Sequence, residues 1–333
     1  MTFADTLRPP APFDPSAPAY KDWLHLNTFD ASSNTIGIFN VSLHGSPRDH
    51  RSRAVGTALL HSQPLGWAGN LEVRGLSEAT IGPRFIGLSK MGFAVVPSPA
   101  SVMTSVVAMD GLASAKVVAT AVSSPLYFDL PLPFGSGWIS WNVIPLLRLE
   151  GTIDAHGTHR DLSHAYAYHD HNWGRWHWGD NIGWEWGCFM SRTGGASFVF
   201  ARTTDRTHQH PGVSWLSMHT QESRRRISAN AVSIECETED TRPQRRFPGA
   251  LAALHQERME IALPSVVRIQ GDDGLDHMEI AFRAHSSTQL ITGDPIVPGY
   301  GFIHELPGEF EATGETRGQR FQHTGLGVFE YVC

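Results

Sequence analysis

Short runs of β-branched and aromatic residues, separated by turn residues, recur along the first half of the chain. Such runs occupy residues 35–43, 54–61, 92–96 and 116–122, and their length and composition are typical of β-strands. Proline and glycine punctuate the sequence throughout, and helical periodicity is scarce; the best helical candidate is 248–256. The pattern predicts a mainly β protein with few short helices.

The chain length indicates how many β units to expect. At 333 residues the chain exceeds one compact domain of ordinary size, so two β-barrel or sandwich domains of ~150 residues each fit best. We expect a proline-rich extended arm over 1–18 that packs on the surface, a first domain over 19–155 and a second over 156–333. The boundary is placed in the polar segment 151–161, which contains two glycines and two histidines.

Composition and charge exclude several classes of protein. Hydrophobic residues make up 41% of the chain and charged residues 18%, which provides ample material for a core and excludes a largely disordered chain. The net charge of −7 argues against a nucleic-acid partner, since phosphate binding requires a basic surface. No apolar stretch is long and uninterrupted enough to predict a transmembrane segment.

The cysteines and the N-terminus indicate the compartment. Cys188, Cys236 and Cys333 are too widely spaced for a disulfide framework or a paired zinc motif, which favours a reducing environment. The first eighteen residues are rich in proline and lack the layout of a signal peptide. The sequence therefore predicts a cytoplasmic protein.

One block carries most of the chemical information. Residues 166–189 read YAYHDHNWGRWHWGDNIGWEWGCF, and five of the ten tryptophans lie between Trp173 and Trp186. Tryptophans interspersed with His, Asp and Glu are typical of a small-molecule cavity with apolar walls and a few ionisable groups. The alternative is a structural aromatic cluster at a domain seam.

Strand alternation decides which side chains of this block meet. If 168–173 is a strand, Tyr168, Asp170 and Asn172 share one face, while His169, His171 and Trp173 share the other. Gly174 allows a bend or bulge that would bring Asp170 and His171 into one site. The sequence leaves these two geometries open.

The motif resembles a known family. Tyr168-x-Asp-His-Asn-Trp-Gly174, followed by Trp184-x-Trp-Gly187, is similar to the signature of the hydroxyneurosporene synthase (carotenoid hydratase) and AttH-like superfamily. Weaker matches are Trp23-Leu-His25-Leu, the strand 138–151, and the closing Gly325-Leu-Gly-Val-Phe-Glu-Tyr331. The resemblance therefore spans nearly the whole chain.

This resemblance implies two lipocalin-like β-domains with a cavity at or near their junction. It also implies cofactor-independent hydration, or cyclisation of polyketide and terpenoid substrates, because the family includes both chemistries. The resemblance to carotenoid hydratases implies a tyrosine and an acid on the following strand, where this chain has Phe198-Val-Phe200. This departure favours a substrate other than a carotenoid, or cyclisation by pocket shape.

The residue types of the block suit this chemistry. Protonating an alkene carbon needs an acid in a dry pocket and aromatic faces to stabilise the carbocation. Asp170 is the predicted acid, or the partner that holds His171 protonated, and Tyr168 is a proton relay. The predicted substrate-binding residues are Trp173, Trp184, Trp186, Asn172, Trp23 and His25. Glu185 should point away from its neighbouring tryptophans, and a surface position is expected for His177.

Two other functional classes remain open. A lipocalin-like cavity also suits a non-catalytic carrier of an apolar ligand. His169 and His171, two apart on one strand face, could instead bind a metal, although no third ligand falls at a persuasive spacing. The leading hypothesis is an enzyme, a lyase or an isomerase of secondary metabolism, that uses neither metal nor cofactor. Its partner is an apolar isoprenoid or polyketide-type substrate, and the sequence leaves open whether it forms a homo-oligomer.

Overall fold

The structure is a computed structural model of residues 1–333. It describes residues 5–8, 17–46, 49–63, 65–97, 100–109, 113–128, 130–155, 157–239, 244–247, 262–294 and 299–333. The chain forms two compact units: unit 1 comprises Met1–Asp180 and Gly293–Tyr300, and unit 2 comprises Asn181–Thr292 and Gly301–Cys333. The helix expected over 248–256 lies outside the described residues.

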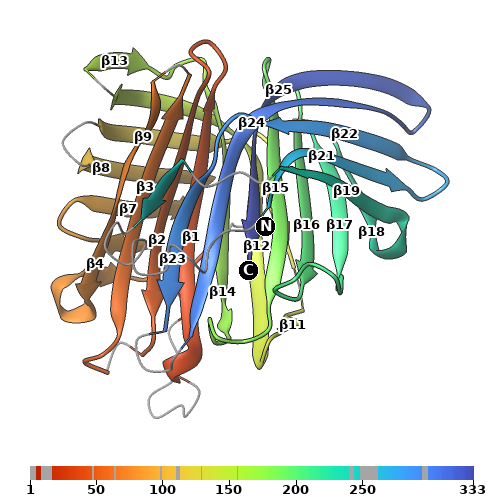
Figure 1. Ribbon diagram of the computed structural model, residues 1–333. Coiled ribbons are helices and arrows are strands. Elements are labelled where there is room, and N and C mark those ends of the chain that lie inside the picture. The colour runs from red at the N-terminus through yellow and green to blue at the C-terminus, as the bar shows by residue number, and fades with distance from the viewer. Residues whose placement is uncertain are drawn as a thin grey trace. The chain divides into compact units, whose positions relative to one another are not determined.

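Unit 1 is built on one curled antiparallel sheet (Figure 1). In the described residues this sheet has 14 strands, ordered β4-β3-β2-β1-β14-β12-β9-β8-β7-β6-β5, with β10, β11 and β13 also paired to β12. Its elements are η1 (Ala17–Ala19), β1 (Tyr20–Asp30), β2 (Thr35–His44), β3 (Arg53–Ser62), β4 (Gly66–Gly75), η2 (Leu76–Glu78), β5 (Thr80–Gly82), β6 (Phe85–Gly87), β7 (Met91–Pro97), β8 (Ala100–Met109), β9 (Ala113–Ala121), β10 (Leu126–Tyr127), β11 (Leu132–Phe134), β12 (Gly137–Ala155), β13 (Thr158–Asp161) and β14 (Tyr166–Arg175).

Unit 2 is built on a second curled sheet. Its 11 described strands pair antiparallel, except for β20 and β23, which are parallel. Its elements are β15 (Gly183–Ser191), β16 (Ser197–Thr204), β17 (Ser214–His219), β18 (Arg224–Ser228), η3 (Ala229–Ala231), β19 (Val232–Glu239), β20 (Arg245–Phe247), β21 (Leu263–Asp272), β22 (His277–Ala284), β23 (Thr288–Gly293), β24 (Tyr300–Thr316) and β25 (Gln319–Val332). The predicted mainly β class with two lipocalin-like domains is confirmed.

Each sheet has its own hydrophobic core. In unit 1 the core includes Leu24, Leu26, Phe39, Val41 and Ile144. In unit 2 it includes Phe189, Phe198, Phe200, Phe282 and Phe329. In both sheets alternate residues of a strand point into the core, so the intervening residues form a second face.

Turn chemistry fixes the hairpin that leads into the site. Between β1 and β2, the Asp30 carboxylate accepts hydrogen bonds from the Ser32 backbone N–H at 3.0 Å and the Ser32 hydroxyl at 2.6 Å. Asn34 takes a positive φ of 48°, a conformation that asparagine tolerates better than most residues. The register of β1 on β2 follows from this turn.

The predicted domain boundary is wrong. The segment 151–161 is not a crossover but the end of β12, a turn, and β13, which pairs back onto β12. Polar residues with glycine are as typical of a hairpin turn as of a linker. The chain therefore stays in unit 1 through β14, and the Tyr168–Gly174 motif belongs to the first unit rather than the second.

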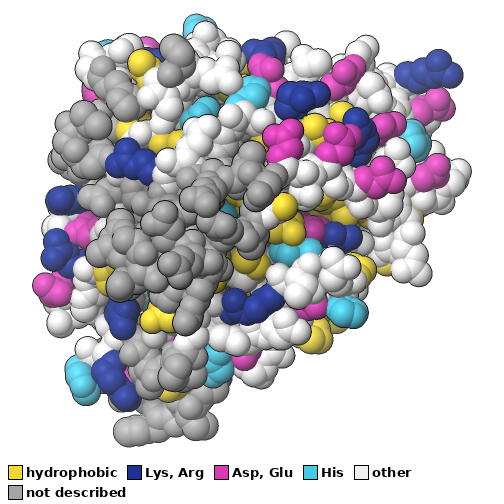
Figure 2. Space-filling view, viewed as in Figure 1, with side chains coloured by type: hydrophobic (Ala, Val, Ile, Leu, Met, Phe, Trp, Pro, Cys, Tyr) yellow, Lys and Arg dark blue, Asp and Glu magenta, His cyan; other side chains and the backbone are white. Residues whose placement is uncertain are grey.

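Charged side chains of both signs intersperse on the outer surface of unit 2. Figure 2 shows blue and magenta side chains side by side over the hairpins β21–β22 and β24–β25. Arg268 and Glu237 form an ion pair there, and Arg320 lies 3.4 Å from Glu315. These pairs are exposed, so each contributes little to stability.

Candidate active site

The motif strand β14 lies between β1 and β12 and carries two different polar faces. On one face the Tyr168 hydroxyl donates to Asp170 Oδ2 at 2.8 Å, and Asn172 Nδ2 donates to Asp170 Oδ1 at 2.5 Å. His169 and His171 bond to a common partner, Asp5, on the opposite face. The predicted alternation is therefore observed, and Asp170 and His171 diverge.

Gly174 does not form the bulge that would bring Asp170 and His171 to the same face of the sheet. It pairs in regular register with Lys21 on β1 and Ile139 on β12. A Cβ at this position would lie 2.2 Å from the Trp138 carbonyl oxygen, so only glycine lets β14 and β12 approach this closely. The glycine of the motif serves strand packing.

The Asp170 face continues onto β1. His25 is the cross-strand partner of Asp170, Asn27 that of Tyr168, and Trp23 that of Asn172, and cross-strand partners share a face. His25 Nε2 donates to Asn27 Oδ1 at 2.9 Å. Burial lowers the pKa of His25, against the opposing effect of the Asp170 charge, so the imidazole is neutral at pH 7.

A buried amide donor faces this group. Asn27 is fully buried, and its Nδ2 has no hydrogen-bond partner among the described residues. Buried donors in folded proteins are nearly always satisfied by protein, water or a ligand. An oxygen atom, from water or from a bound molecule, would complete the site at Asn27.

Three tryptophans of unit 1 pack together beside Asn172. Trp23 stacks on Trp178 with centroids 6.4 Å apart and meets Trp176 edge to face at 5.3 Å. The turn carrying Trp176 and Trp178 is held by Asp294, whose carboxylate accepts the Trp178 backbone N–H at 2.8 Å and pairs with buried Lys21 at 2.7 Å. Trp176 and Trp178 were not among the predicted site residues.

The opposite face of β14 carries a buried ion network, the clamp, formed by Asp5, Asp22, His169 and His171. Asp5 Oδ2 accepts from His169 Nε2 at 2.8 Å, and Asp5 Oδ1 accepts from His171 Nδ1. His171 Nε2 donates to Asp22 Oδ1 at 2.6 Å, and His169 Nδ1 donates to the His25 carbonyl at 2.6 Å. All four clamp side chains are fully buried.

The contacts of the clamp set the charges of His171 and Asp5. Burial alone would lower the pKa of His171, but the carboxylates of Asp5 and Asp22 raise it to about 10. Burial likewise opposes ionisation of Asp5, and the charge of His171 and the hydrogen bonds from both histidines hold the pKa of Asp5 well below its ordinary value. His171 is thus a cation at neutral pH, held by Asp5 and Asp22 rather than by Asp170.

This geometry disfavours the metal hypothesis. A histidine binds a metal through a ring nitrogen lone pair. Both ring nitrogens of His169 and both of His171 lie instead within hydrogen-bond distance of protein oxygens. In the described part of the chain, no group of three or more His, Cys, Asp or Glu side chains has an arrangement that could hold a metal ion.

The structure also places two further residues that the sequence singled out, Trp173 and His177. Trp173 lies on the clamp side, 8% exposed, with the Arg8 guanidinium 4.2 Å from its ring centroid. It therefore does not share a face with Asp170. His177 is partly exposed, as expected for a loop residue, and its Nδ1 lies 3.5 Å from Asp294.

Trp184 and Trp186 belong to unit 2. Both point away from the core face of β15, and the Trp184 indole N–H donates to the Glu330 carboxylate. As predicted, Glu185 faces the other way, but it is buried rather than solvated. The proposed contact of Trp184 and Trp186 with substrate stays a prediction.

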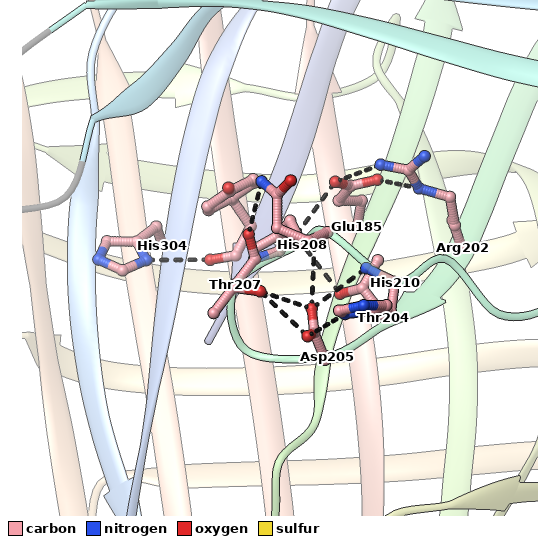
Figure 3. A network of polar contacts seen from close by, with 10 residues as sticks. Glu185, Arg202, Thr204, Asp205, Thr207, His208, His210 and His304 are labelled. Atoms are coloured by element: carbon pink, nitrogen blue, oxygen red, sulfur yellow. Dashed lines mark hydrogen bonds and ion pairs between the residues drawn. The ribbon is translucent and has the colours of Figure 1, made fainter.

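Glu185 is the centre of a second ion network (Figure 3). Arg202 donates to its two oxygens at 2.5 and 2.7 Å, and His208 Nδ1 lies 3.1 Å from Oε1. The His208 ring stacks on Tyr331 at 3.7 Å. Burial raises the pKa of Glu185, but the hydrogen bonds from His208 and Arg202 outweigh it, so the net shift is downward.

The loop that carries His208 is organised by Asp205. Its carboxylate accepts hydrogen bonds from Thr207 and from the backbone N–H of Gln209, and it pairs with His210 at 2.8 Å. These contacts hold His208 at a φ of 59°, a conformation that costs energy for a non-glycine residue. This network carries no local sequence signal, because its members are separated along the chain.

Comparison with known proteins supports the fold. No family model and no curated protein matches the chain. A putative AttH from Nitrosomonas europaea superposes with a TM-score of 0.67 at 14% identity, covering 94% of this chain and 92% of that one. Kievitone hydratase from Nectria haematococca gives 0.62 at 11% identity, covering 96% and 90%.

A third solved structure, CghA with Sch210972, gives a TM-score of 0.60 at 12% identity, covering 99% of this chain and 94% of that one. At these identities the likeness shows a shared fold and no more. The AttH-like and hydratase structures are nevertheless the neighbours that the Tyr168–Gly174 motif led us to expect. Among the helices of the described residues, none is long and apolar enough to span a membrane.

Proposed function

We propose that the protein is an enzyme that adds or removes water at a double bond, or closes a ring, in an apolar isoprenoid or polyketide-type substrate, with Asp170 as its acid and base. The observation that carries the proposal is the buried Asp170 carboxylate, hydrogen-bonded by the neutral donors Tyr168 and Asn172 and faced by His25. A buried carboxyl among neutral partners suits proton transfer better than one fixed in an ion pair.

The neighbouring residues take complementary roles. Tyr168, 2.8 Å from Asp170, relays a proton, and neutral His25 accepts or returns one. In the hydration branch, the protonated Asp170 carboxyl gives its proton to a substrate carbon, a water adds to the resulting cation, and the surplus proton of that water passes to His25 and back to Asp170. Trp23, the cross-strand partner of Asn172, is the aromatic residue proposed to stabilise positive charge. None of these steps calls on a cofactor.

The unsatisfied Asn27 amide supplies a place for oxygen. Its Nδ2 lacks a partner among the described residues and shares a face with Asp170. In hydration it would hold the attacking water, and in cyclisation it would donate to a substrate carbonyl. The fold is compatible with both branches, since one neighbour is a hydratase by name and another was solved with a small molecule.

The test is an incubation of purified protein in heavy-oxygen water with a panel of isoprenoid and polyketide precursors, followed by mass spectrometry. A product that gains labelled water only with active protein identifies a hydratase. An unchanged mass at a new retention time identifies a cyclase or isomerase. Ligand binding with no new product from any precursor would contradict the proposal and leave a carrier.

A further inference from the structure

We propose that Asp5 is a positioning residue for the reaction: it fixes β14 and β1 from behind and thereby sets the place of Asp170 and His25 on the opposite face. This inference rests on the proposed role of Asp170. It assigns a function to a segment that sequence analysis treated as a surface arm, and to the two histidines of the motif.

The N-terminal segment is anchored inside unit 1. Asp5 is 1% exposed, Leu7 joins the hydrophobic core, and the Leu7 backbone N–H donates to the Pro83 carbonyl at 2.8 Å. The Arg8 backbone N–H donates to Asp22 Oδ2 at 2.6 Å, and its guanidinium covers the Trp173 ring at 4.2 Å. Asp5, Leu7 and Arg8 are therefore anchored in unit 1, and this part of the N-terminal segment is not a loose surface arm.

Asp5 joins the two residues that flank Asp170. His169 precedes Asp170 and His171 follows it, and each donates a ring N–H to a different oxygen of Asp5. Because successive side chains of a strand point to opposite faces, holding both neighbours fixes the rotation of the strand at Asp170. Rotation about the strand axis is the motion that would misdirect the Asp170 carboxylate.

The clamp extends from β14 to β1. His169 Nδ1 donates to the backbone carbonyl of His25, whose side chain faces Asp170, and His171 Nε2 donates to Asp22. The Tyr20 hydroxyl also donates to Asp22. Asp5 therefore stabilises the relative placement of both strands that carry the proposed site.

The clamp is surrounded by side chains of the N-terminal segment, β1 and β7. Among the described residues, Asp5 and Asp22 bond to the two rings, Tyr20 and the Arg8 backbone N–H bond to Asp22, and the charges of His169 and His25 act on one another. Phe93 of β7 contributes an apolar ring 5.7 Å from His169. Removing the Asp5 charge thus leaves Asp22 as the carboxylate that remains on the His171 ring.

The experiment compares Asp5→Asn and Asp5→Glu with Asp154→Asn in the full chain. Asparagine keeps one acceptor oxygen but turns an N–H toward the other ring, and glutamate keeps the charge while displacing it by one methylene. Asp154 is a matched control, since it pairs with His159 at 2.7 Å on the surface. Ring titration of His171 by NMR, the ¹³C shift of the Asp170 carboxyl, and kcat and KM are measured for each.

We expect Asp5→Asn to lower kcat on the order of 10–100-fold with little change in KM, as for other misplaced catalytic groups. His171 should lose its proton at lower pH than in the wild type, and the Asp170 carboxyl signal should shift. Asp5→Glu should fold and still lose kcat, whereas Asp154→Asn should match the wild type.

Two results would overturn the inference. One is an unmoved Asp170 carboxyl signal in the Asp5 variants. The other is a kcat equal to wild type in Asp5→Glu with only a lower melting temperature, which indicates a purely structural carboxylate. The NMR measurements need no substrate. If the wild-type protein turns over no precursor, the proposed function is refuted, and the NMR signals still show whether Asp5 positions Asp170.

Discussion

The two faces of β14 place buried carboxylates in opposite electrostatic surroundings. On the clamp side, Asp5 and Asp22 are matched by the rings of His169 and His171. On the other side, the donors that bond to Asp170 among the described residues are the neutral groups of Tyr168 and Asn172. A buried carboxylate paired with cations is fixed in one ionisation state, while one among neutral donors is available for proton transfer.

This difference separates structure from chemistry within one strand. The clamp is a buried ion network, whose value lies in orienting groups more than in net stability. It is completed by residues distant in sequence, since 166 positions separate His171 from Asp5. The Asp170 face is completed by its neighbours on β14 and β1. We therefore expect substitutions on the clamp side to lower stability more than substitutions on the Asp170 side.

The largest expected effect on stability is at Asp22. Asp22→Ala removes the acceptor for His171, Tyr20 and the Arg8 backbone N–H, which leaves donors unsatisfied and takes away one of the two carboxylates on the buried His171 cation. We expect a loss of about 3–5 kcal/mol of unfolding free energy, the usual cost of breaking a buried pair. Urea denaturation measures it, and a loss below about 1 kcal/mol would contradict the clamp as described.

The pH dependence of stability sharpens the comparison. The folded-state pKa of His171 is raised to about 10 from 6.5, so its stabilisation is fully present below pH ~6.5 and is lost as the pH rises toward 10. We expect the unfolding free energy to fall across this window in the wild type and to fall less in His171→Gln. Equal slopes in the two proteins would show that His171 is not the titrating group.

A smaller effect is expected from the other face. Tyr168→Phe removes one of the two hydrogen bonds on Asp170 and the proposed relay. Turnover should fall about 10-fold, and stability should change by about 1 kcal/mol, as for a single hydrogen bond. Tyr300→Phe, at a residue 45% exposed, is the control. A stability loss as large as that of Asp22→Ala would remove the distinction between the faces.

The sequence predicted the strands well because their alternation is local. The runs at 35–43 and 54–61 correspond to β2 and β3, and the two faces of the motif follow from period-two geometry. The boundary at 151–161 failed because polar, glycine-containing segments form hairpin turns as readily as linkers.

The site was predicted only as far as its contacts are local or in cross-strand register. Tyr168, Asp170 and Asn172 lie two apart on one strand, and His25 was suggested by a motif match. Nothing in the sequence links Asp5 to His171, because a lone aspartate in a proline-rich arm carries no periodic signal. The partner of His171, and the Arg8 guanidinium over the Trp173 ring, came only from the tertiary structure.

The most direct test of the central claim is Asp170→Asn, assayed for substrate affinity, turnover and unfolding free energy on the same preparation. The asparagine retains the size and the acceptor oxygen of Asp170 but cannot exchange a proton. The account predicts retained affinity, turnover reduced at least about 100-fold, as for loss of a general acid–base group, and near-wild-type stability. Wild-type turnover by the Asp170→Asn variant would contradict this claim. So would a wild-type protein that binds substrate without turning it over and an Asp170→Asn variant that binds it equally well.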